Sequence, residues 1–348
     1  MNDNFYRVCL LIFLSIILLS CKKDKPVENN TGLTNTELNK GVFICNEGNF
    51  MSGNAQLSFY NVSNDSVIQN LYEAANNSKL GDILNSMCFF SSKAYLIINN
   101  SQKIIVADSI LFNKTAEISG FTSPRFFLSV NNSKAYVTDL FADEVSVVDL
   151  GLNVISKTIP LKGWTEALLL TEDKLFVTNR ASDKLFIIDA ITDMLTDSIQ
   201  IGYGANSIQK DIDGKVWVLC EGNLTDNIYA SLYRIDPVNM QVEQSLQFDQ
   251  LSDAPSSLKI SGSLDTLYFI NEHLYQMKIT EVSLPSQYFI SGNNKTFYGI
   301  GVDPKNGDIY ISDVIDYVQR GRIYRYSNDG TLKRSFLAGI IPGNIYFN

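Results

Sequence analysis

A short pattern of strand-like runs and polar turns recurs along this chain of 348 residues, and it constrains the fold more than any other feature. The clearest copy is residues 124–161, where runs rich in β-branched and aromatic residues are separated by the polar segments NNSK, DLFADE and DLGLN. This copy predicts four short antiparallel strands. Such a sheet is not stable alone, because one apolar face stays open.

The aromatic residue of the second run recurs at intervals of about 40 or about 50 residues, which is typical of the blades of a β-propeller. Each of these anchors is followed by apolar or hydroxyl residues and then by a polar turn, as in YVTD and FVTN. The anchors are Phe43, Tyr95, Tyr136, Phe176, Trp217, Tyr268 and Tyr310. The sequence therefore predicts an all-β fold, a seven-bladed β-propeller with four antiparallel strands per blade and no helix.

The two ends of residues 41–348 complement each other. No first strand precedes Gly41, whereas residues 342–348 match the first-strand segment PRFFLSV and have no strand after them. A C-terminal strand that completes the first blade leaves no free sheet edge between the ends. We therefore expect residues 41–348 to form one closed propeller that does not fold without its last strand.

The first 40 residues are predicted to export and anchor the protein. An apolar run over residues 8–19 is too short for a membrane span and suits a signal peptide that comprises residues 1–20. The run ends in LLSC, which resembles the bacterial lipoprotein box and predicts lipidation of Cys21; an ordinary secretory signal is the alternative. Residues 21–40 are polar and predict a lipidated, flexible tether. Several acyl chains give stable membrane anchoring.

Charge and cysteine content limit the possible partners and cross-links. The net charge is −9 and no basic block is present, which argues against nucleic acid as a partner because its affinity depends on Lys and Arg. Beyond the predicted signal and lipid site, Cys45, Cys88 and Cys220 lie in apolar strand contexts. Three thiols cannot all pair, so we expect free buried cysteines.

The order of the strands assigns the connections to two faces. Connections after the second and fourth strands share one face, and connections after the first and third strands share the other. On the latter face the turns are short and polar, and Asp149, Asp189 and Asp236 are predicted to cap them. The former face carries the long loops, so we expect recognition there.

Aromatic, amide and charged side chains gather in the long loops. This combination at the mouth of a funnel suits the capture of a bulky ligand with a polar rim. Any one of these residues can instead be a solvated loop residue or part of the blade packing. The predicted ligand-binding residues are Asn46, Glu47, Asn49, Phe50, Arg125, Phe141, Trp164, Arg180, Tyr203, Asn206, Glu221, Asn271, Tyr298 and Tyr317.

No motif identifies a catalytic centre. His273 is the only histidine, which excludes His-rich metal sites, and no serine lies in a G-x-S-x-G context. Neither an EF-hand calcium loop nor a glycine-rich phosphate loop is present. We therefore predict no catalytic residue, metal or cofactor and favour binding over catalysis, although carboxylates on the loop face leave a catalytic acid pair open.

The repeat SP…KAYVTD…EVSVVD…ISKTI resembles the YVTN-type, YncE-like propellers over residues 41–348. With the lipoprotein signal, the opening GVFICNEGNFMSGNAQLSFYN resembles lipid-anchored propellers of Bacteroidetes-type bacteria, among them the surface cobalamin-binding lipoproteins of the BtuG type. This resemblance implies an outer-membrane lipoprotein, on the cell surface or the periplasmic side. It also implies a corrinoid as a candidate ligand and a TonB-dependent transporter as a candidate partner.

Three functions follow from these observations. The first is a lipid-anchored protein that captures a bulky small-molecule nutrient on its loop face. The second is a protein-interaction scaffold, which a large exposed apolar patch would favour. The third is a hydrolase or lyase similar to the propeller lactonases, which convergent acids in a central funnel would favour.

Overall fold

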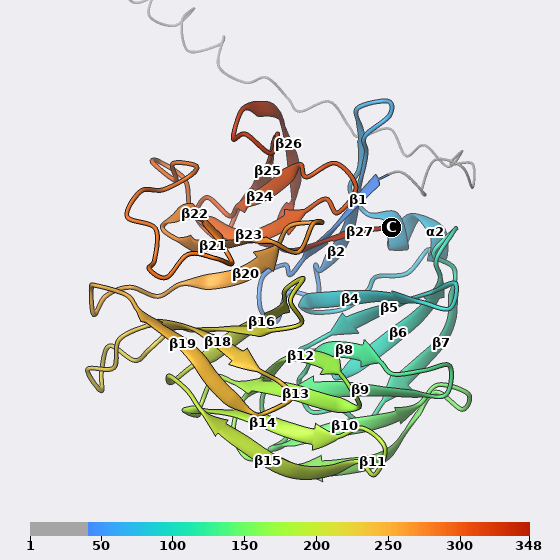
Figure 1. Ribbon diagram of the computed structural model, residues 1–348. Helices are drawn as coiled ribbons and strands as arrows, with labels where there is room; N and C mark the ends of the chain where they lie inside the picture. The colour runs from blue at the N-terminus through green and yellow to red at the C-terminus, as the bar shows by residue number, and fades with distance from the viewer. Residues whose placement is uncertain (1–40) are drawn as a thin grey trace, which may run out of the picture. The chain divides into compact units, whose positions relative to one another are not determined.

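The computed structural model describes residues 41–348, which form seven antiparallel sheets. The predicted signal peptide, the lipidation site at Cys21 and the tether lie outside the described residues. Each sheet is one blade of the propeller, so the predicted seven-bladed fold is confirmed (Figure 1). Among residues 41–348, no helix has the length and the apolar character that crossing a membrane requires.

The first strands of the blades line the centre of the ring (Figure 1). They are β4 (Leu84–Phe90), β8 (Pro124–Ser129), β12 (Thr165–Thr171), β16 (Ala205–Lys210), β20 (Ser256–Ile260), β23 (Phe297–Val302) and β27 (Pro342–Phe347). Each of them contacts the first strand of the next blade. Because β27 contacts both β23 and β4, the ring is closed.

The aromatic anchors lie in the second strands and form the core between neighbouring blades. These strands are β1 (Gly41–Asn46), β5 (Lys93–Ile98), β9 (Lys134–Asp139), β13 (Lys174–Asn179), β17 (Val216–Cys220), β21 (Thr266–Asn271) and β24 (Ile309–Asp313). All seven anchors are at most 4% exposed. Tyr95, for example, stacks on Phe127 of the next blade with 4.4 Å between ring centroids. Each anchor therefore joins two blades.

The third and fourth strands complete the blades toward the outside. The third strands are β2 (Gln56–Asn61), β6 (Lys103–Asp108), β10 (Glu144–Asp149), β14 (Lys184–Asp189), β18 (Ser231–Asp236), β22 (His273–Lys278) and β25 (Arg320–Tyr326). The fourth strands are β3 (Ser66–Ile68), β7 (Lys114–Ser119), β11 (Val154–Pro160), β15 (Met194–Gln200), β19 (Gln241–Gln247) and β26 (Leu332–Ile340).

Two blades differ from the predicted repeat. The sheet of the sixth blade contains only β20, β21 and β22. The segment that follows makes a single bridge, between Leu274 and Ile290, and its Pro285 has no N–H to donate to a strand ladder. In the first blade, β3 is followed by a short helix, α2 (Leu71–Asn76), which the strand pattern did not predict. The helix forms where Leu71 and Tyr72 bury their side chains in the core.

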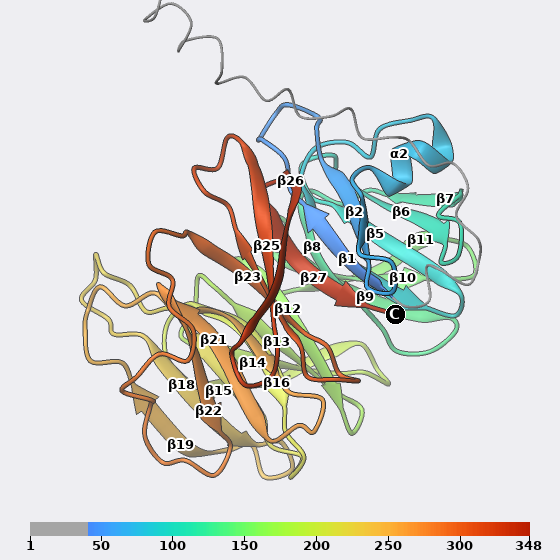
Figure 2. The same ribbon diagram turned by 90° about the horizontal axis from the view of Figure 1, so that it is seen from above.

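The C-terminal strand completes the first blade, as predicted from the two ends of the sequence. β27 pairs with β1 in antiparallel register, with Val42 opposite Phe347 and Ile44 opposite Ile345. Figure 2 shows the red C-terminal strand beside the blue N-terminal one. The side chain of Asn46 adds a second connection, because its Oδ1 accepts a hydrogen bond from the N–H of Gly339 at 2.8 Å.

The turns on the face opposite the long loops are capped as predicted. The Oδ1 atoms of Asp149, Asp189 and Asp236 each accept hydrogen bonds from two backbone N–H groups of the turn that follows. This face is less polar than expected. The tips of its turns expose the aliphatic side chains of Leu152, Ile191 and Val238.

Three cysteines and the histidine lie within the described residues. Cys45 and Cys220 are buried, Cys88 is partly buried, and all three are free thiols. Burial raises the pKa of the Cys88 thiol to about 11. His273 accepts a hydrogen bond at Nδ1 from the N–H of Gly292 and packs edge-on against Tyr288.

Candidate functional site

An extra residue interrupts the first strand of every blade close to its start. In β8 the register shifts between Pro124 and Phe127, so that Arg125 and Phe126 together face Thr138 of β9. The same irregularity occurs in the first strands of the other blades. A β-bulge of this kind bends the strand and re-aims a side chain.

A hydroxyl residue of the second strand satisfies the bulged N–H in three of the blades. Thr138 Oγ1 accepts from the N–H of Phe126 at 3.0 Å and donates to the carbonyl oxygen of Glu166 at 2.6 Å. Thr178 and Ser312 accept in the same way in the fourth and seventh blades, at 2.8 Å. The hydroxyl of the YVTD-type motif therefore holds the bulge in place.

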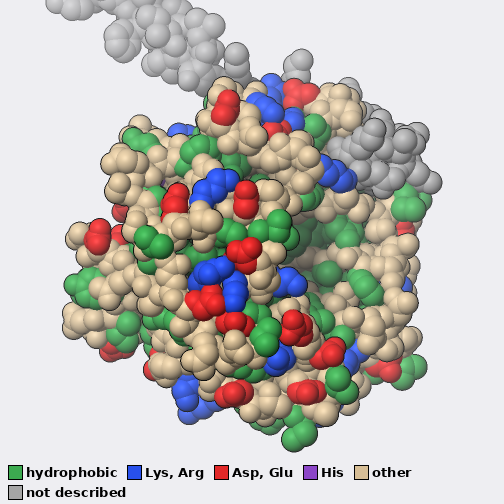
Figure 3. Space-filling model, in the orientation of Figure 1, with side chains coloured by type: hydrophobic (Ala, Val, Ile, Leu, Met, Phe, Trp, Pro, Cys, Tyr) green, Lys and Arg blue, Asp and Glu red, His purple; other side chains and the backbone are tan. Residues whose placement is uncertain are grey.

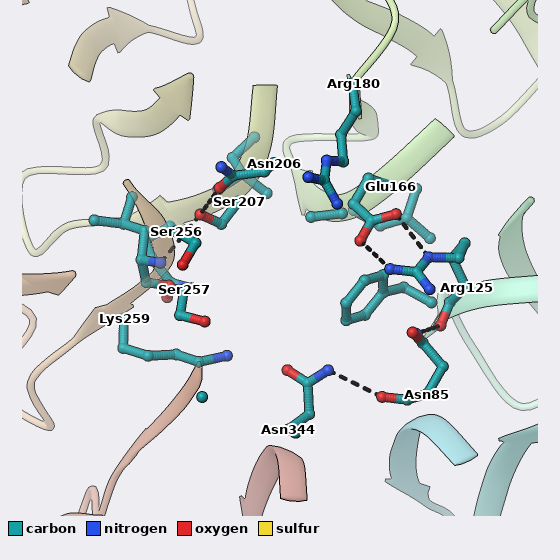
Figure 4. Close-up of a pocket in the computed structure, with 18 of the residues that line it drawn as sticks. Asn85, Arg125, Glu166, Arg180, Asn206, Ser207, Ser256, Ser257, Lys259 and Asn344 are labelled. Atoms are coloured by element: carbon teal, nitrogen blue, oxygen red, sulfur yellow. Dashed lines mark hydrogen bonds and ion pairs between the residues drawn. The ribbon is translucent and has the colours of Figure 1, made fainter. Parts of the chain in front are cut away.

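The bulges direct one residue from each blade into the wall of a central cavity of about 530 Å³ (Figure 4). The cavity lies at the end of the propeller where the fourth-to-first connections emerge, and Figure 3 shows the molecule hollowed near its centre. Each of these residues is the second in its strand. They are Asn85, Arg125, Glu166, Asn206, Ser257, Tyr298 and Gly343, and we call them the ring.

A bidentate ion pair forms one side of the cavity wall. Arg125 donates from Nε and Nη2 to the two carboxylate oxygens of Glu166, at 2.8 and 2.6 Å. Glu166 also accepts from Nε1 of Trp164 at 2.6 Å. The side chains of Arg125 and Glu166 are only 16% and 6% exposed, so the pair is shielded from water.

A second bidentate pair lies beside the first, on the loops that follow β13 and β17. Arg180 donates to both oxygens of Glu221, at 3.1 and 2.6 Å. Its guanidinium carbon lies 4.2 Å from the centroid of the Trp164 ring, and that of Arg125 lies 5.4 Å from it. Trp164 thus orients both arginines by cation–π contact.

Glu47 is the remaining carboxyl group of the wall. Its Oε1 accepts a hydrogen bond from the hydroxyl of Tyr298 at 3.0 Å. Burial raises the pKa of Glu47, although the nearby Arg125 guanidinium and the Tyr298 hydroxyl act in the opposite direction. Tyr298 also has a raised pKa, because it is buried beside this carboxyl group. The hydrogen bond joins the first blade to the neighbouring seventh blade.

Six of the sequence-predicted residues meet in the cavity wall, and a seventh contacts two of them. Arg125, Asn206 and Tyr298 do so from strand positions, not from the loops where the sequence placed them, because the bulges turn them inward. The loops supply the other three. The six are Glu47, Arg125, Arg180, Asn206, Glu221 and Tyr298. The seventh is Trp164, which stacks against Arg125 and Arg180.

Two of the predicted amides serve other parts of the structure. Asn46 is fully buried, and its Nδ2 donates to the backbone of the first blade and to Ser58 Oγ at 2.9 Å. Its side chain therefore stabilises the closure of the propeller between β1 and β26. Asn271 donates to Asp253 at 2.8 Å and lines a different cavity, beside the sixth blade.

The remaining predicted residues lie on loops at the same end of the propeller as the cavity. Phe50 and Phe141 lie on loops and are 68% and 72% exposed. Tyr317 packs edge-on against Tyr298, and its carbonyl oxygen accepts a hydrogen bond from Nδ2 of Asn49. Tyr203 is half-buried beside the fifth blade. We call Phe50, Phe141 and Tyr317 the rim.

Sequence reasoning missed several polar residues of the wall. Asn85, Glu166 and Ser257 each lie about ten or eleven residues before an aromatic anchor, as Arg125 and Asn206 do. An alignment of the first strands on the anchors would have found them. Lys259 and Asn344 follow the ring position within two residues and had no comparable signal.

The fold and the site define a class: a seven-bladed β-propeller with a polar cavity at one end of its axis. Residues 40–338 match the family described as Domain of unknown function (DUF5074), and the chain belongs to this family. No curated protein matches the sequence.

Solved structures of other propellers share the fold. A quinonprotein alcohol dehydrogenase-like protein from Bacteroides thetaiotaomicron is 15% identical, with a TM-score of 0.70 over 89% of this chain and 78% of its own. The periplasmic gluconolactonase of Pseudomonas aeruginosa is 10% identical, with a TM-score of 0.66 over 88% of this chain and 98% of its own. The β-propeller domain of Myceliophteria thermophila Cps50 is 16% identical, with a TM-score of 0.60 over 79% and 94%. At these identities the likeness establishes the fold alone.

Proposed function

We propose that the protein is a binding protein that holds a small polar molecule in its central cavity. The observation that carries this proposal is the ring, in which the same bulged position of every blade faces one cavity. A volume of about 530 Å³ lies within the range of small-molecule sites, roughly 300–1,000 Å³.

The wall of the cavity is held in place before any ligand binds. Nδ2 of Asn85 donates to the carbonyl oxygen of Arg125 at 2.5 Å, and Nδ2 of Asn206 donates to that of Pro255 at 2.8 Å. These bonds cross from one blade to the next, so that they fix the side chains on a rigid sheet framework. A preorganised site loses little conformational entropy on binding, which favours affinity.

The resemblance to cobalamin-binding propellers suggests a corrinoid as the nutrient. A corrinoid is larger than the drug-sized compounds that cavities of this volume enclose. It would therefore lie across the mouth, against the rim residues Phe50, Phe141 and Tyr317, with only a part of it in the cavity. This placement predicts that rim substitutions weaken cobalamin binding.

We also propose that the protein is anchored to the outer membrane through Cys21 and passes its ligand to a TonB-dependent transporter. The lipoprotein-like sequence LLSC supports the anchor. Incorporation of labelled palmitate into the wild type, and its loss in Cys21→Ser, would test it. Co-purification with a transporter from outer membranes would test the partner.

A second candidate function is hydrolysis of a lactone. It rests on Glu47, a carboxyl group with a raised pKa in the cavity wall that is hydrogen-bonded to Tyr298. A group of this kind can act as a general acid or base. The gluconolactonase with the same fold makes lactones the first substrates to assay. Activity that Glu47→Gln abolishes would favour this function over binding alone.

A thermal-shift screen with a cavity-filling variant tests the main proposal. Neutral sugars, sugar acids, inorganic phosphate and cobalamin would be added to the wild type and to Ala167→Met, which places a longer side chain in the cavity. A cavity ligand should raise the Tm of the wild type and not that of the variant.

Ala181→Met is the matched control, because Ala181 is exposed on the same blade and outside the cavity wall. It should respond to ligands as the wild type does. If every active compound raised the Tm of Ala167→Met as strongly as that of the wild type, the cavity would not be the binding site. A response to cobalamin alone that survives in Ala167→Met would place binding at the rim.

A further inference from the structure

Lys259 extends from β20 into the central cavity. In Figure 4 its Nζ points into the open space of the cavity, near Ser257 and Asn344. The side chain lines the wall and is partly buried. Ser257, two residues earlier in the bulge of the same strand, has a φ of 58°, a left-handed conformation that is uncommon for a residue other than glycine. The bulge lies between Ser256 and Lys259, and both Ser257 and Lys259 line the cavity.

No carboxylate compensates the charge of Lys259 within residues 41–348. Its Nζ makes no ion pair and donates no hydrogen bond to any described residue, in contrast to the other cations of the wall. Arg125 is neutralised by Glu166, and Arg180 by Glu221. Glu47 is engaged by the Tyr298 hydroxyl.

An unpaired ammonium in the wall of a cavity is costly, because its burial removes water without supplying a counter-ion. In agreement with this, burial lowers the pKa of Lys259. The chain as a whole is acidic, with a net charge of −9. The positive charge is therefore a local feature of the cavity and not part of a general basic surface.

Hydrogen-bonding groups surround the ammonium. Ser257 Oγ donates to the carbonyl oxygen of Tyr298 at 3.1 Å and keeps its lone pairs. Nδ2 of Asn344 donates to the carbonyl oxygen of Asn85 at 2.9 Å, which leaves its Oδ1 as an acceptor on the cavity side (Figure 4). The surroundings of Lys259 thus offer acceptors for the hydroxyl groups of a ligand, and Lys259 itself is the charged donor.

We propose that the ligand of the cavity carries an oxyanion, a carboxylate or a phosphate, that binds against Nζ of Lys259. The rest of the ligand bears hydroxyl groups that meet the amide and hydroxyl side chains of the wall, as in a sugar acid or a sugar phosphate. This inference rests on the proposed function, because it names the class of molecule that the cavity takes.

Isothermal titration with matched probes tests the inference. D-Gluconate, D-glucose 6-phosphate and inorganic phosphate would be compared with the neutral D-glucose on the wild type and on Lys259→Gln. A hydrogen bond to a charged group contributes about 1.5–3 kcal/mol, so the variant should bind the anionic probe about ten- to a hundredfold more weakly. Its affinity for glucose should stay unchanged. Preference for gluconate or for a phosphate identifies the oxyanion.

Lys174→Gln is the matched control, since Lys174 lies at the opposite end of β13 and outside the cavity wall. It should bind every probe as the wild type does. Because Lys259 has no partner to lose, Lys259→Gln should fold with an unchanged or higher Tm. An equal loss of affinity in both variants would overturn the inference.

The outcomes separate this inference from the proposed function. Binding of glucose and gluconate with equal affinity, unchanged in Lys259→Gln and lost in Ala167→Met, would overturn the oxyanion and leave the cavity as the site. Absence of binding of all four probes, together with no response to any compound in the thermal-shift screen, would overturn both.

Discussion

At the scale of single residues, Glu166 holds two functional side chains of the cavity wall at once. It accepts two hydrogen bonds from Arg125 and one from Trp164. Glu166→Gln removes the charge and leaves a largely buried guanidinium without its partner. Removal of one member of a buried ion pair typically costs about 3–5 kcal/mol. We expect the free energy of unfolding, measured in urea, to fall by about 3 kcal/mol.

The second pair of the wall provides the comparison for this prediction. Arg180 and Glu221 form the same bidentate contact, but their side chains are more exposed, at 27% and 25%. Glu221→Gln should therefore cost about 1 kcal/mol or less. The double variant Arg125→Met with Glu166→Leu should be more stable than Glu166→Gln, because it removes both charges. Equal losses in Glu166→Gln and Glu221→Gln would contradict the role of burial.

Glu47 should make the stability of the protein depend on pH. Its pKa is raised in the folded state, so the folded protein binds the proton more tightly than the unfolded chain. The free energy of unfolding must then fall as pH rises from the unfolded-state pKa, about 4.3, through the folded-state pKa. Glu47→Gln keeps an acceptor for Tyr298 and removes the titration.

The measurement for Glu47 is the difference in Tm between Glu47→Gln and the wild type across the pH range. We expect this difference to become more favourable to the variant as pH rises above about 4.3. The same difference at every pH would show that folding does not raise the pKa of the Glu47 carboxyl group. Glu73→Gln, on the helix α2, provides a carboxyl control outside the cavity.

At the scale of elements, the bulge in the first strand depends on a hydroxyl group of the second. Thr138→Val keeps the shape of the side chain but leaves the N–H of Phe126 without an acceptor and the carbonyl oxygen of Glu166 without a donor. Such loss costs about 1–3 kcal/mol. We expect a decrease of this size in urea unfolding. Thr138→Ser should retain most of the stability, and an equally destabilised serine variant would contradict the assignment.

The sequence indicated this element only in part. The hydroxyl and the aspartate of YVTD are visible, and so is the polar turn after them, because both are local signals. The bulge is not local. Its extra residue is accommodated by the packing of neighbouring first strands around the propeller axis, which the sequence of one repeat does not show. Arg125 and Tyr298 were therefore expected on loops. Glu166 was likewise assigned to a loop, in the segment KGWTE, and was not selected as a binding residue. Lys259 was overlooked because it stands within a strand, where a polar residue ordinarily faces solvent.

At the scale of the whole molecule, the repeat predicted the fold because its anchors record the packing between blades. The stacking of Tyr95 on Phe127 and the burial of Tyr136 arise from the same kind of blade interface, which is repeated around the propeller. The blades form the cavity wall together, so the sequence of a single repeat does not identify the residues that line it. The sequence pattern also did not predict that the sixth blade lacks its fourth strand. An irregular segment around Pro285 follows β22 instead.

Closure by β27 makes the fold depend on the last residues of the chain. β27 pairs with β1, contacts β4 and β23, and buries Ile345 in the core. Deletion of residues 342–348 therefore opens the first blade and removes Gly343 of the ring and Asn344 of the cavity wall. Since a typical domain is stable by only about 5–15 kcal/mol, we expect the truncated chain not to fold.

Far-ultraviolet circular dichroism and size-exclusion chromatography of the deletion variant check this expectation. Removal of Asn348 alone is the control, because this exposed residue offers only its carbonyl oxygen, to Lys305 at 2.9 Å. The control should remain monodisperse with the strand content of the wild type. A deletion variant that is equally soluble, folded and cooperative in thermal unfolding would show that the propeller stays closed without its C-terminal strand. Since β27 also carries part of the cavity wall, the closure of the fold and the completion of the site are a single structural event.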